Sequence, residues 1–181
     1  MLSRIEFAQA QSRAAAALAA AGIVITPAER AAIEVADFGL GDLERIGLEI
    51  VVYVNTERCC AKELVLFPWQ ICPEHRHPAR DGRPGKEETF RCRAGQVYLY
   101  VPGAPAAAPR GRVPAARAGA FTVWHEIVLA PGEQYTLAPD TLHWFQAGPD
   151  GAIVSEFSTK SVDEADIFTD PDIQRMPEVG E

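Results

Sequence analysis

The sequence has few basic side chains, and this shortage narrows the range of possible partners. Lysine and arginine together number 17, against 25 aspartates and glutamates, which gives a formal net charge of −8. A field of that sign repels phosphate backbones and anionic lipid headgroups. We therefore expect neither nucleic acid nor a membrane surface as a partner.

Long apolar runs are missing as well. The alanine-rich stretch 14–21 is too short to span a bilayer, and its flanks lack the basic run and the cleavage site of a signal peptide. We therefore expect a cytoplasmic protein. With 48% hydrophobic and 23% charged residues, the chain has the balance of a globular protein, and we predict that residues 1–181 form one domain.

Paired cysteines are a third absence. The four cysteines, Cys59, Cys60, Cys72 and Cys92, form no CxxC pair, which argues against a zinc ribbon or a redox motif. We expect free thiols that are mostly buried.

Helix-forming residues are concentrated near the N-terminus. Residues 3–21 are rich in Ala, Gln, Arg and Glu, and Gly22 follows where a helix C-cap commonly lies, so we predict a helix here. A shorter helix should begin near Thr26, because Thr-Pro-Ala-Glu supplies an N-cap, a proline at the first helical position and a capping-box glutamate. This second helix should end before Asp37.

From Leu48 onward, short runs rich in β-branched and aromatic residues replace the helix formers. Turn residues such as Gly85, Gly95 and Pro139 separate them, which is typical of strands. The predicted strands include residues 51–54, 64–67, 88–91, 96–101, 121–129, 134–137, 143–146 and 152–157. Many short strands indicate an all-β sandwich or barrel, with residues 1–36 as a helical extension packed outside it.

Two segments depart from this pattern. Residues 102–119 are dense in Pro, Ala and Gly and poor in large apolar side chains, so we predict a mobile surface loop with no chemistry of its own. The C-terminal tail, residues 160–181, is acidic, and Thr-Asp-Pro at 169–171 signals a turn or a short helix. Arg175 could pair with a carboxylate near a pocket mouth, but we expect it to be exposed.

Three of the four histidines are spaced so that they could share a metal ion. His75 and His77 are two residues apart, so in a strand their imidazoles point to the same face. Glu88 should follow on the next strand of a hairpin, and His143 on a strand that returns across the barrel. Three imidazoles and a carboxylate leave open positions on a divalent ion, whereas the lack of a thiolate argues against a closed structural zinc site. The HxH pair alone is equally consistent with a solvated turn.

Two stretches resemble sequence motifs of a known family. Residues 75–95 resemble the first cupin motif, in which two histidines and a glutamate precede a glycine, and residues 132–143 resemble the second. Trp69 stands where the first motif usually has glycine, and the spacer from His77 to Glu88 is longer than usual. The resemblance implies a cupin-type β-barrel or jelly roll, with the three histidines and the glutamate named above as metal ligands.

A longer resemblance spans roughly residues 34–175 and is carried by four stretches: VADFGLGDLERIGLEIVVYVNTERCCAKELVLFPWQICPEHRHP, GKEETFRCRAGQVYLYV, TVWHEIVLAPGEQYTLAPDTLHWFQAG and SEFSTKSVDEADIFTDPDIQR. They resemble the cupin-type D-lyxose isomerases, which are small sugar ketol-isomerases. The resemblance implies interconversion of D-lyxose and D-xylulose, often with D-mannose and D-fructose as secondary substrates. It also implies a divalent metal, most often Mn(II). Because cupins are commonly dimers, we expect a homodimer.

Sugar isomerisation of this kind needs a proton carrier beside a Lewis acid, because a proton leaves C2 and one returns to C1. Glu156 interrupts the apolar run AIVSEFS and shares a strand face with Val154, so we predict that it projects into the barrel as the base. Lys62 shares a face with Leu64 and Leu66, and we predict an electrophile that orients or protonates a sugar oxygen. The plainer interpretations are an exposed strand carboxylate and a surface lysine.

Two other functions remain open at this point. The same ligand set serves metal dioxygenases and epimerase-like cupins, in which the open positions take oxygen or another substrate. The second alternative is a non-catalytic cupin that senses a sugar or stores a metal. An inward base next to the ion argues against it, because a pure binding protein has no need of one.

Overall fold

The structure, a computed structural model, describes residues 2–175 and 180. The end of the predicted C-terminal tail, at residues 176–179 and 181, lies outside the described residues. The α-helices and strands are α1 (Arg4–Ala20), α2 (Pro27–Ala31), β1 (Glu34–Ala36), β2 (Leu48–Asn55), β3 (Cys60–Leu66), β4 (Ile71–Arg76), β5 (Glu88–Val101), β6 (His125–Leu129), β7 (Gln134–Leu137), β8 (His143–Ser158) and β9 (Ile167–Phe168). Two 3₁₀ helices, η1 (Ala115–Ala120) and η2 (Asp163–Ala165), lie between strands.

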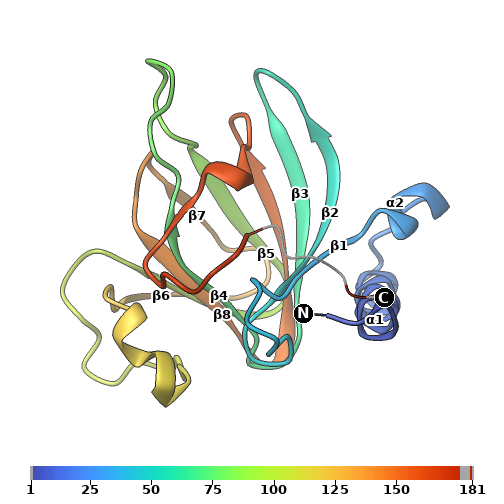
Figure 1. Cartoon of the computed structure of the whole chain (residues 1–181), viewed down its shortest axis with the longest axis horizontal. Coiled ribbons are helices and arrows are strands. Elements are labelled where there is room, and N and C mark those ends of the chain that lie inside the picture. Colours follow the sequence, from blue (N-terminus) through green and yellow to red (C-terminus); the bar gives the residue numbers. More distant parts are fainter. Residues whose placement is uncertain (1, 176–179, 181) are drawn as a thin grey trace.

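Both predicted helices are present, and each begins with a capping box. Ser3 caps α1 together with Glu6, and Thr26 caps α2 together with Glu29, so the first backbone N–H groups of each helix have partners. The buried face of α1 consists mainly of alanines, which let the helix lie close against the outer face of the sheet. Figure 1 shows both helices beside the barrel, outside it. Among the described residues, no helix is long and apolar enough to cross a membrane.

The strands curl into one barrel-like sheet (Figure 1). Along one path the order is β1-β2-β3-β8-β4-β9, and β5 pairs with β6, β7 and β8. The long strands β5 and β8 run antiparallel to each other and join the two parts of the sheet. Each covers two of the predicted strands, and bulges near Cys92 and Gly95 let the pair bend without breaking.

Strand pairing differs from the prediction at two places. The expected hairpin between the strands that carry His75 and Glu88 is wrong, because β4 and β5 do not pair with each other and both pair with β8. The strand predicted at 121–129 begins only at His125. The backbone N–H groups of Thr122 and Val123 instead donate to the buried carboxylate of Glu74.

Cross-strand register decides which side chains face the interior. Leu64 and Leu66 of β3 point inward and belong to the main apolar core, so Lys62, on the same face, points inward as well. Lys62 is directly opposite Glu156, and His75 is directly opposite His143. One end of the barrel interior is therefore apolar and the other end is polar.

Residues 102–119 make specific contacts with the barrel. The guanidinium of Arg112 lies 3.7 Å from the centroid of a Trp69 ring, and its backbone N–H donates to Gln146 at 2.7 Å. Arg117, in η1, pairs with Asp170 at 2.6 Å. The mobility of this segment stays a prediction, but its role as a docking partner of the C-terminal segment was not foreseen.

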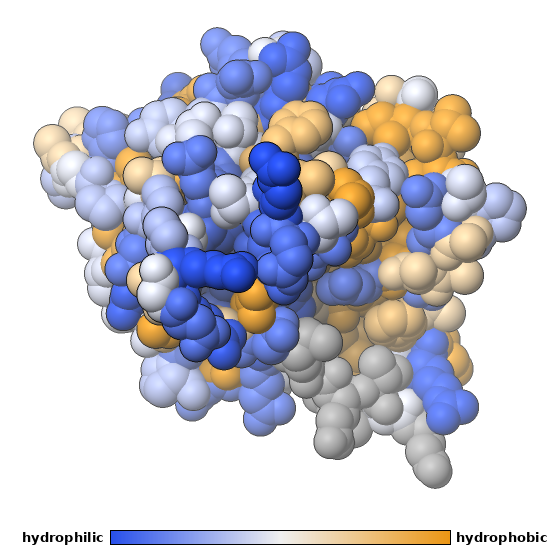
Figure 2. Space-filling view, turned by 90° about the horizontal axis from the view of Figure 1, so that it is seen from above, coloured by the Kyte–Doolittle hydropathy of each residue, from blue (hydrophilic) through white to orange (hydrophobic). Residues whose placement is uncertain are grey.

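The surface is hydrophilic over much of the barrel and more apolar beside the helices, as Figure 2 shows from above. Three of the four cysteines are buried and Cys59 is exposed, and all four are free thiols, as expected.

Candidate functional site

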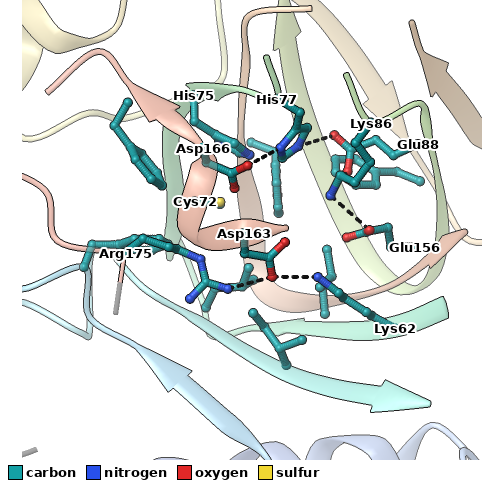
Figure 3. A pocket seen from close by; sticks show the side chains of 17 residues that line it. Lys62, Cys72, His75, His77, Lys86, Glu88, Glu156, Asp163, Asp166 and Arg175 are labelled. Atoms are coloured by element: carbon teal, nitrogen blue, oxygen red, sulfur yellow. Dashed lines mark hydrogen bonds and ion pairs between the residues drawn. The ribbon is translucent and has the colours of Figure 1, made fainter. Parts of the chain in front are cut away.

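A pocket at the polar end of the barrel interior collects the chemically active side chains (Figure 3). Its volume is about 390 Å³, part of which is open to solvent. Leu48, Ile50, Leu64, Phe90 and Phe145 line its apolar wall. The opposite side is closed by the C-terminal segment, which contributes Asp163, Asp166, Phe168 and Arg175.

Three histidines meet in this pocket. His75 belongs to β4, His143 begins β8, and His77 follows β4 by one residue. Their ring centroids are 4.3 Å apart for His75 and His143, 4.9 Å for His75 and His77, and 5.4 Å for His77 and His143. One ring nitrogen from each lies within 4.8 Å of those of the other two, and all three residues are buried. Imidazole nitrogens at such separations can ligate one metal ion.

The outer nitrogens of two rings face backbone carbonyls. Nδ1 of His75 lies 2.8 Å from the carbonyl oxygen of Pro73, and Nδ1 of His143 lies 2.9 Å from that of Thr141. A carbonyl can only accept, so Nδ1 carries the proton in both rings and Nε2 keeps its lone pair. Burial and the neighbouring His143 and His77 also lower the pKa of His75 well below its ordinary value. A neutral imidazole is the form that binds metals.

Glu88 lies against the inner nitrogens. Its Oε1 is 3.0 Å from Nε2 of His77 and 3.1 Å from Nε2 of His143. Nε2 of His143 is buried and has no hydrogen-bond partner in the described part of the chain. A lone pair held this close to a carboxylate is unfavourable unless positive charge lies nearby.

Two sources of positive charge suit this arrangement. Burial opposes a charge on His77, but the carboxylates of Glu88 and Asp166 outweigh it and raise the pKa of His77 to about 9. Protonated His77 still leaves Nε2 of His143 unpartnered. A divalent cation would satisfy all three inner nitrogens and the carboxylate together, so the residues fit such an ion.

Lys86 links the histidine cluster to Glu156. Its Nζ lies 2.7 Å from Oε2 of Glu88 and 3.1 Å from Oε1 of Glu156, and both carboxylates are buried. Burial alone would lower the pKa of Lys86, but Glu156, Glu88 and Asp163 raise it well above its ordinary value. Lys86 is therefore a permanent positive charge between two buried carboxylates. Ser158 donates a further hydrogen bond to Oε1 of Glu156 at 2.8 Å.

Lys62 points into the pocket from β3, the strand that pairs with the part of β8 that carries Glu156. Its Nζ donates to Oγ of Ser161 at 2.9 Å and lies 2.7 Å from Oδ2 of Asp163. Arg175 reaches the same Asp163 oxygen at 3.0 Å. Burial raises the pKa of Asp163, but Lys62, Lys86 and Arg175 outweigh it, so the net shift is downward. Asp163 is therefore ionised and holds two cations at the pocket wall.

The expectation that Arg175 is exposed is wrong, because only 12% of its side chain is accessible. The C-terminal segment folds back over the barrel, and the guanidinium of Arg175 pairs with the carboxylate of Asp163 at the pocket. All six residues singled out in the sequence therefore meet around one pocket: Lys62, His75, His77, Glu88, His143 and Glu156. Their roles stay predictions.

Sequence reasoning missed Lys86, Asp163 and Asp166. A signal existed for Lys86, because it precedes Glu88 by two residues and so shares its face. No signal existed for the two aspartates. They belong to a segment that the sequence marks only as an acidic tail, and only the path of the folded chain brings them to the pocket.

Comparison with known proteins shows to which family the chain belongs. The chain is 62% identical to the D-lyxose ketol-isomerase of Thermofilum sp. (strain ex4484_79), over 99% of both chains. It is 62% identical to the D-lyxose/D-mannose isomerase of Thermosediminibacter oceani, also over 99% of both, and 60% identical to the D-lyxose ketol-isomerase of Cohnella laeviribosi, over 95% of this chain and 94% of that one. The chain belongs to the D-lyxose isomerase family. The family model described as D-lyxose isomerase matches residues 113–181.

Membership of the D-lyxose isomerase family makes the chain a sugar aldose–ketose isomerase. It gives no support to the alternatives of a dioxygenase and of a non-catalytic binding protein.

Solved structures agree on the fold. The L-ribose isomerase of Cellulomonas parahominis, solved with L-ribose, matches with a TM-score of 0.79 at 19% identity, over 95% of this chain and 94% of that one. The L-ribose isomerase of Acinetobacter sp. DL28 in complex with L-ribose matches with a TM-score of 0.79 at 18% identity and the same coverage. The predicted cupin-type β-barrel with helices packed outside is thus confirmed.

Proposed function

We propose that this isomerase interconverts D-lyxose and D-xylulose, with D-mannose and D-fructose as a second pair, and that it works with a divalent metal ion, Mn(II). One observation carries the proposal. The inner nitrogens of three histidines converge with the carboxylate of Glu88, beside a second buried carboxylate, Glu156. The names of relatives at 60–62% identity, D-lyxose ketol-isomerase and D-lyxose/D-mannose isomerase, support the choice of sugars.

His75, His77, His143 and Glu88 would hold the ion. When bound there, it supplies a Lewis acid that polarises the sugar oxygens and stabilises the negative charge of an enediolate. An ion held by three imidazoles and one carboxylate keeps coordination positions for substrate. Nitrogen and oxygen ligands without thiolate suit Mn(II), although the same set accepts other divalent ions.

Glu156 is our proposed base. Its carboxylate removes the proton from C2, holds it, and returns it to C1, while the hydroxyl proton on O2 passes to O1 with the help of Lys62 as the electrophile at a sugar oxygen. Because Glu156 is only 3% exposed, bulk water has little access to the proton while the carboxylate holds it. Lys86 and Ser158 both contact Oε1 of Glu156 and so fix the direction of its carboxyl group.

Two lysines complete the proposed site. Lys86 supplies positive charge beside both carboxylates. Lys62 remains our proposed electrophile for a sugar oxygen, because an ammonium has three N–H donors and the contacts to Ser161 and Asp163 use two of them. A homodimer and a cytoplasmic location also remain proposals.

A substrate and metal panel tests the proposed function. Metal-stripped protein is incubated with D-lyxose, D-mannose and D-ribose in turn, with and without added Mn(II), and ketose formation is followed. We expect ketose from D-lyxose and D-mannose, only after Mn(II) is added, and much less from D-ribose. Equal rates with and without metal would refute the metal dependence, and the lack of ketose from D-lyxose would refute the substrate.

A further inference from the structure

The three histidine rings are not held in the same way. The Nδ1 atoms of His75 and His143 face carbonyl groups two residues earlier in their own segments. Nδ1 of His77 instead lies 2.5 Å from a carboxylate oxygen of Asp166, which is 89 residues later in the sequence. His77 also lies just past the end of β4, so no strand ladder fixes its backbone. Of the three rings, His77 therefore depends most on a distant part of the chain.

Asp166 belongs to a segment that closes the pocket, which we call the C-terminal strap and define as residues 159–175. Strand β9, within the strap, pairs with β4 and places Phe168 opposite His75. The two rings stack with centroids 5.3 Å apart. Figure 3 shows Asp166 directed at His77, and Asp163 between Lys62 and Arg175. The strap thus touches two of the three histidines.

Further contacts hold the strap to the barrel at both ends. Near its start, Asp163 pairs with Lys62 at 2.7 Å. Near its end, Thr169 makes two hydrogen bonds to Glu74, from its N–H to the backbone oxygen at 3.0 Å and from Oγ1 to Oε1 at 2.7 Å. The contact between Asp166 and His77 lies between these anchors. Through this hydrogen bond, the strap holds one ring of the histidine cluster.

We propose that Asp166 is a positioning residue that couples metal binding to docking of the C-terminal strap. The inference rests on the proposed metal site. A carboxylate that accepts the Nδ1 proton fixes the ring of His77 and makes its Nε2 a stronger donor to a metal ion. Coupling between two equilibria is reciprocal. Docking of the strap therefore tightens metal binding, and bound metal stabilises the docked strap by the same factor.

Metal affinity is the first measurement. Metal-stripped full-length protein is titrated with Mn(II), and free Mn(II) is followed by its paramagnetic resonance signal, which needs no catalysis. For Asp166→Ala we expect affinity to fall about 10- to 100-fold, the usual cost of losing such a partner. Asp166→Asn, whose amide oxygen can still accept the Nδ1 proton, should fall less. Glu164→Gln, an exposed neighbour in the same strap, is the matched control and should bind like the wild type.

Hydrogen exchange of the strap is the second measurement, and it detects the reciprocal effect. Added Mn(II) should slow amide exchange in residues 159–175 of the wild type and of Glu164→Gln. In Asp166→Ala the same addition should leave exchange there nearly unchanged. A purely structural role for Asp166 would raise exchange above that of the wild type, but added Mn(II) would still slow it by the wild-type factor, and that result would overturn the coupling.

The outcomes separate the two proposals. If the wild type binds no Mn(II), the metal site fails and the coupling fails with it. If the wild type binds Mn(II) and both Asp166 variants bind it equally well, the metal site stands and the coupling is overturned. Should Asp166→Ala not fold, Asp166→Asn carries both measurements, since it keeps the size and shape of the side chain.

Discussion

Nζ of Lys86 lies 3.1 Å from Oε1 of Glu156, and both residues are buried. This contact ties the proposed base to the carboxylate of Glu88, because the same ammonium lies 2.7 Å from Oε2 of Glu88. The two carboxylates therefore share one counter-charge. Any change at Lys86 acts on the proposed base and on the proposed metal ligand together.

Replacement of Lys86 by methionine, which keeps most of its length and removes its charge, should nearly abolish isomerisation. Two buried carboxylates would lose their common partner, and we expect kcat/KM to fall by roughly 100-fold or more. Initial rates with D-lyxose at saturating Mn(II) measure the effect. Lys86→Arg keeps the charge and should retain more activity than Lys86→Met. Equal losses in both variants would show that the charge is not what matters.

Replacement of Glu156 by glutamine should separate chemistry from metal binding. The amide keeps the shape of the carboxylate but cannot accept the C2 proton, so kcat should fall roughly 10²- to 10⁴-fold. Mn(II) affinity should stay close to that of the wild type, because in the described part of the chain it is Lys86 that links Glu156 to the proposed metal ligand Glu88. Wild-type turnover in a variant that binds metal normally would refute the role of Glu156 as the base.

Glu49 should make stability depend on pH, away from the active site. It is fully buried, and one of its oxygens has no hydrogen-bond partner among the described residues. Burial raises the pKa of Glu49 to about 8, against a hydrogen bond from Gln70 that lowers it. The folded protein thus keeps a proton that the unfolded chain releases above about pH 4.5. The free energy of unfolding should therefore decrease as the pH rises from about 4.5 to 8.

Glu49→Gln should remove this loss of stability at higher pH, because the glutamine amide does not ionise. The Tm of the variant should match the wild type near pH 5 and exceed it increasingly up to pH 8. One pKa unit corresponds to about 1.4 kcal/mol, and 1 kcal/mol moves the Tm of a chain this size by about 2–4 °C. Thermal unfolding at several pH values measures the difference, with exposed Glu87→Gln as the control. A Tm difference that does not change with pH would contradict the assignment.

Gly95 should be essential for the bend shared by β5 and β8. Its φ is +69°, and a Cβ there would lie 2.0 Å from the carbonyl oxygen of Gly151. Gly95→Ala should therefore destabilise the protein by about 2–4 kcal/mol, measured by urea unfolding. Gly119→Ala is the matched control, because a Cβ at Gly119 meets nothing within 4 Å. A similar change in both variants would mean that the close approach at Gly95 can relax.

The sequence predicted the features that depend on local pattern. The helix formers of residues 3–21 and the capping box at Thr26 mark the two helices, and the alternation of residues in β3 and β8 places Lys62 and Glu156 inside the barrel. Features that depend on long-range topology were missed or wrong. No local signal shows that β8 lies between β4 and β5.

The C-terminal segment illustrates the same limit. By composition alone it is an acidic tail, and Arg175, of whose side chain only 12% is accessible, was expected to be exposed. Its acidic residues matter because they pair with cations far away in the sequence: Asp163 with Lys62 of β3, and Asp170 with Arg117 of η1. A contact between charges far apart in the sequence becomes visible only in the fold.

Crystals of the full chain soaked with Mn(II), and measured for anomalous scattering from manganese, test the metal centre most directly. We predict one strong peak between the Nε2 atoms of His75, His77 and His143 and the carboxylate of Glu88. The same experiment on His143→Ala should show a weaker peak or none. A wild-type crystal with no peak between these residues, or with manganese bound only elsewhere, would contradict the proposed metal centre and the mechanism built on it.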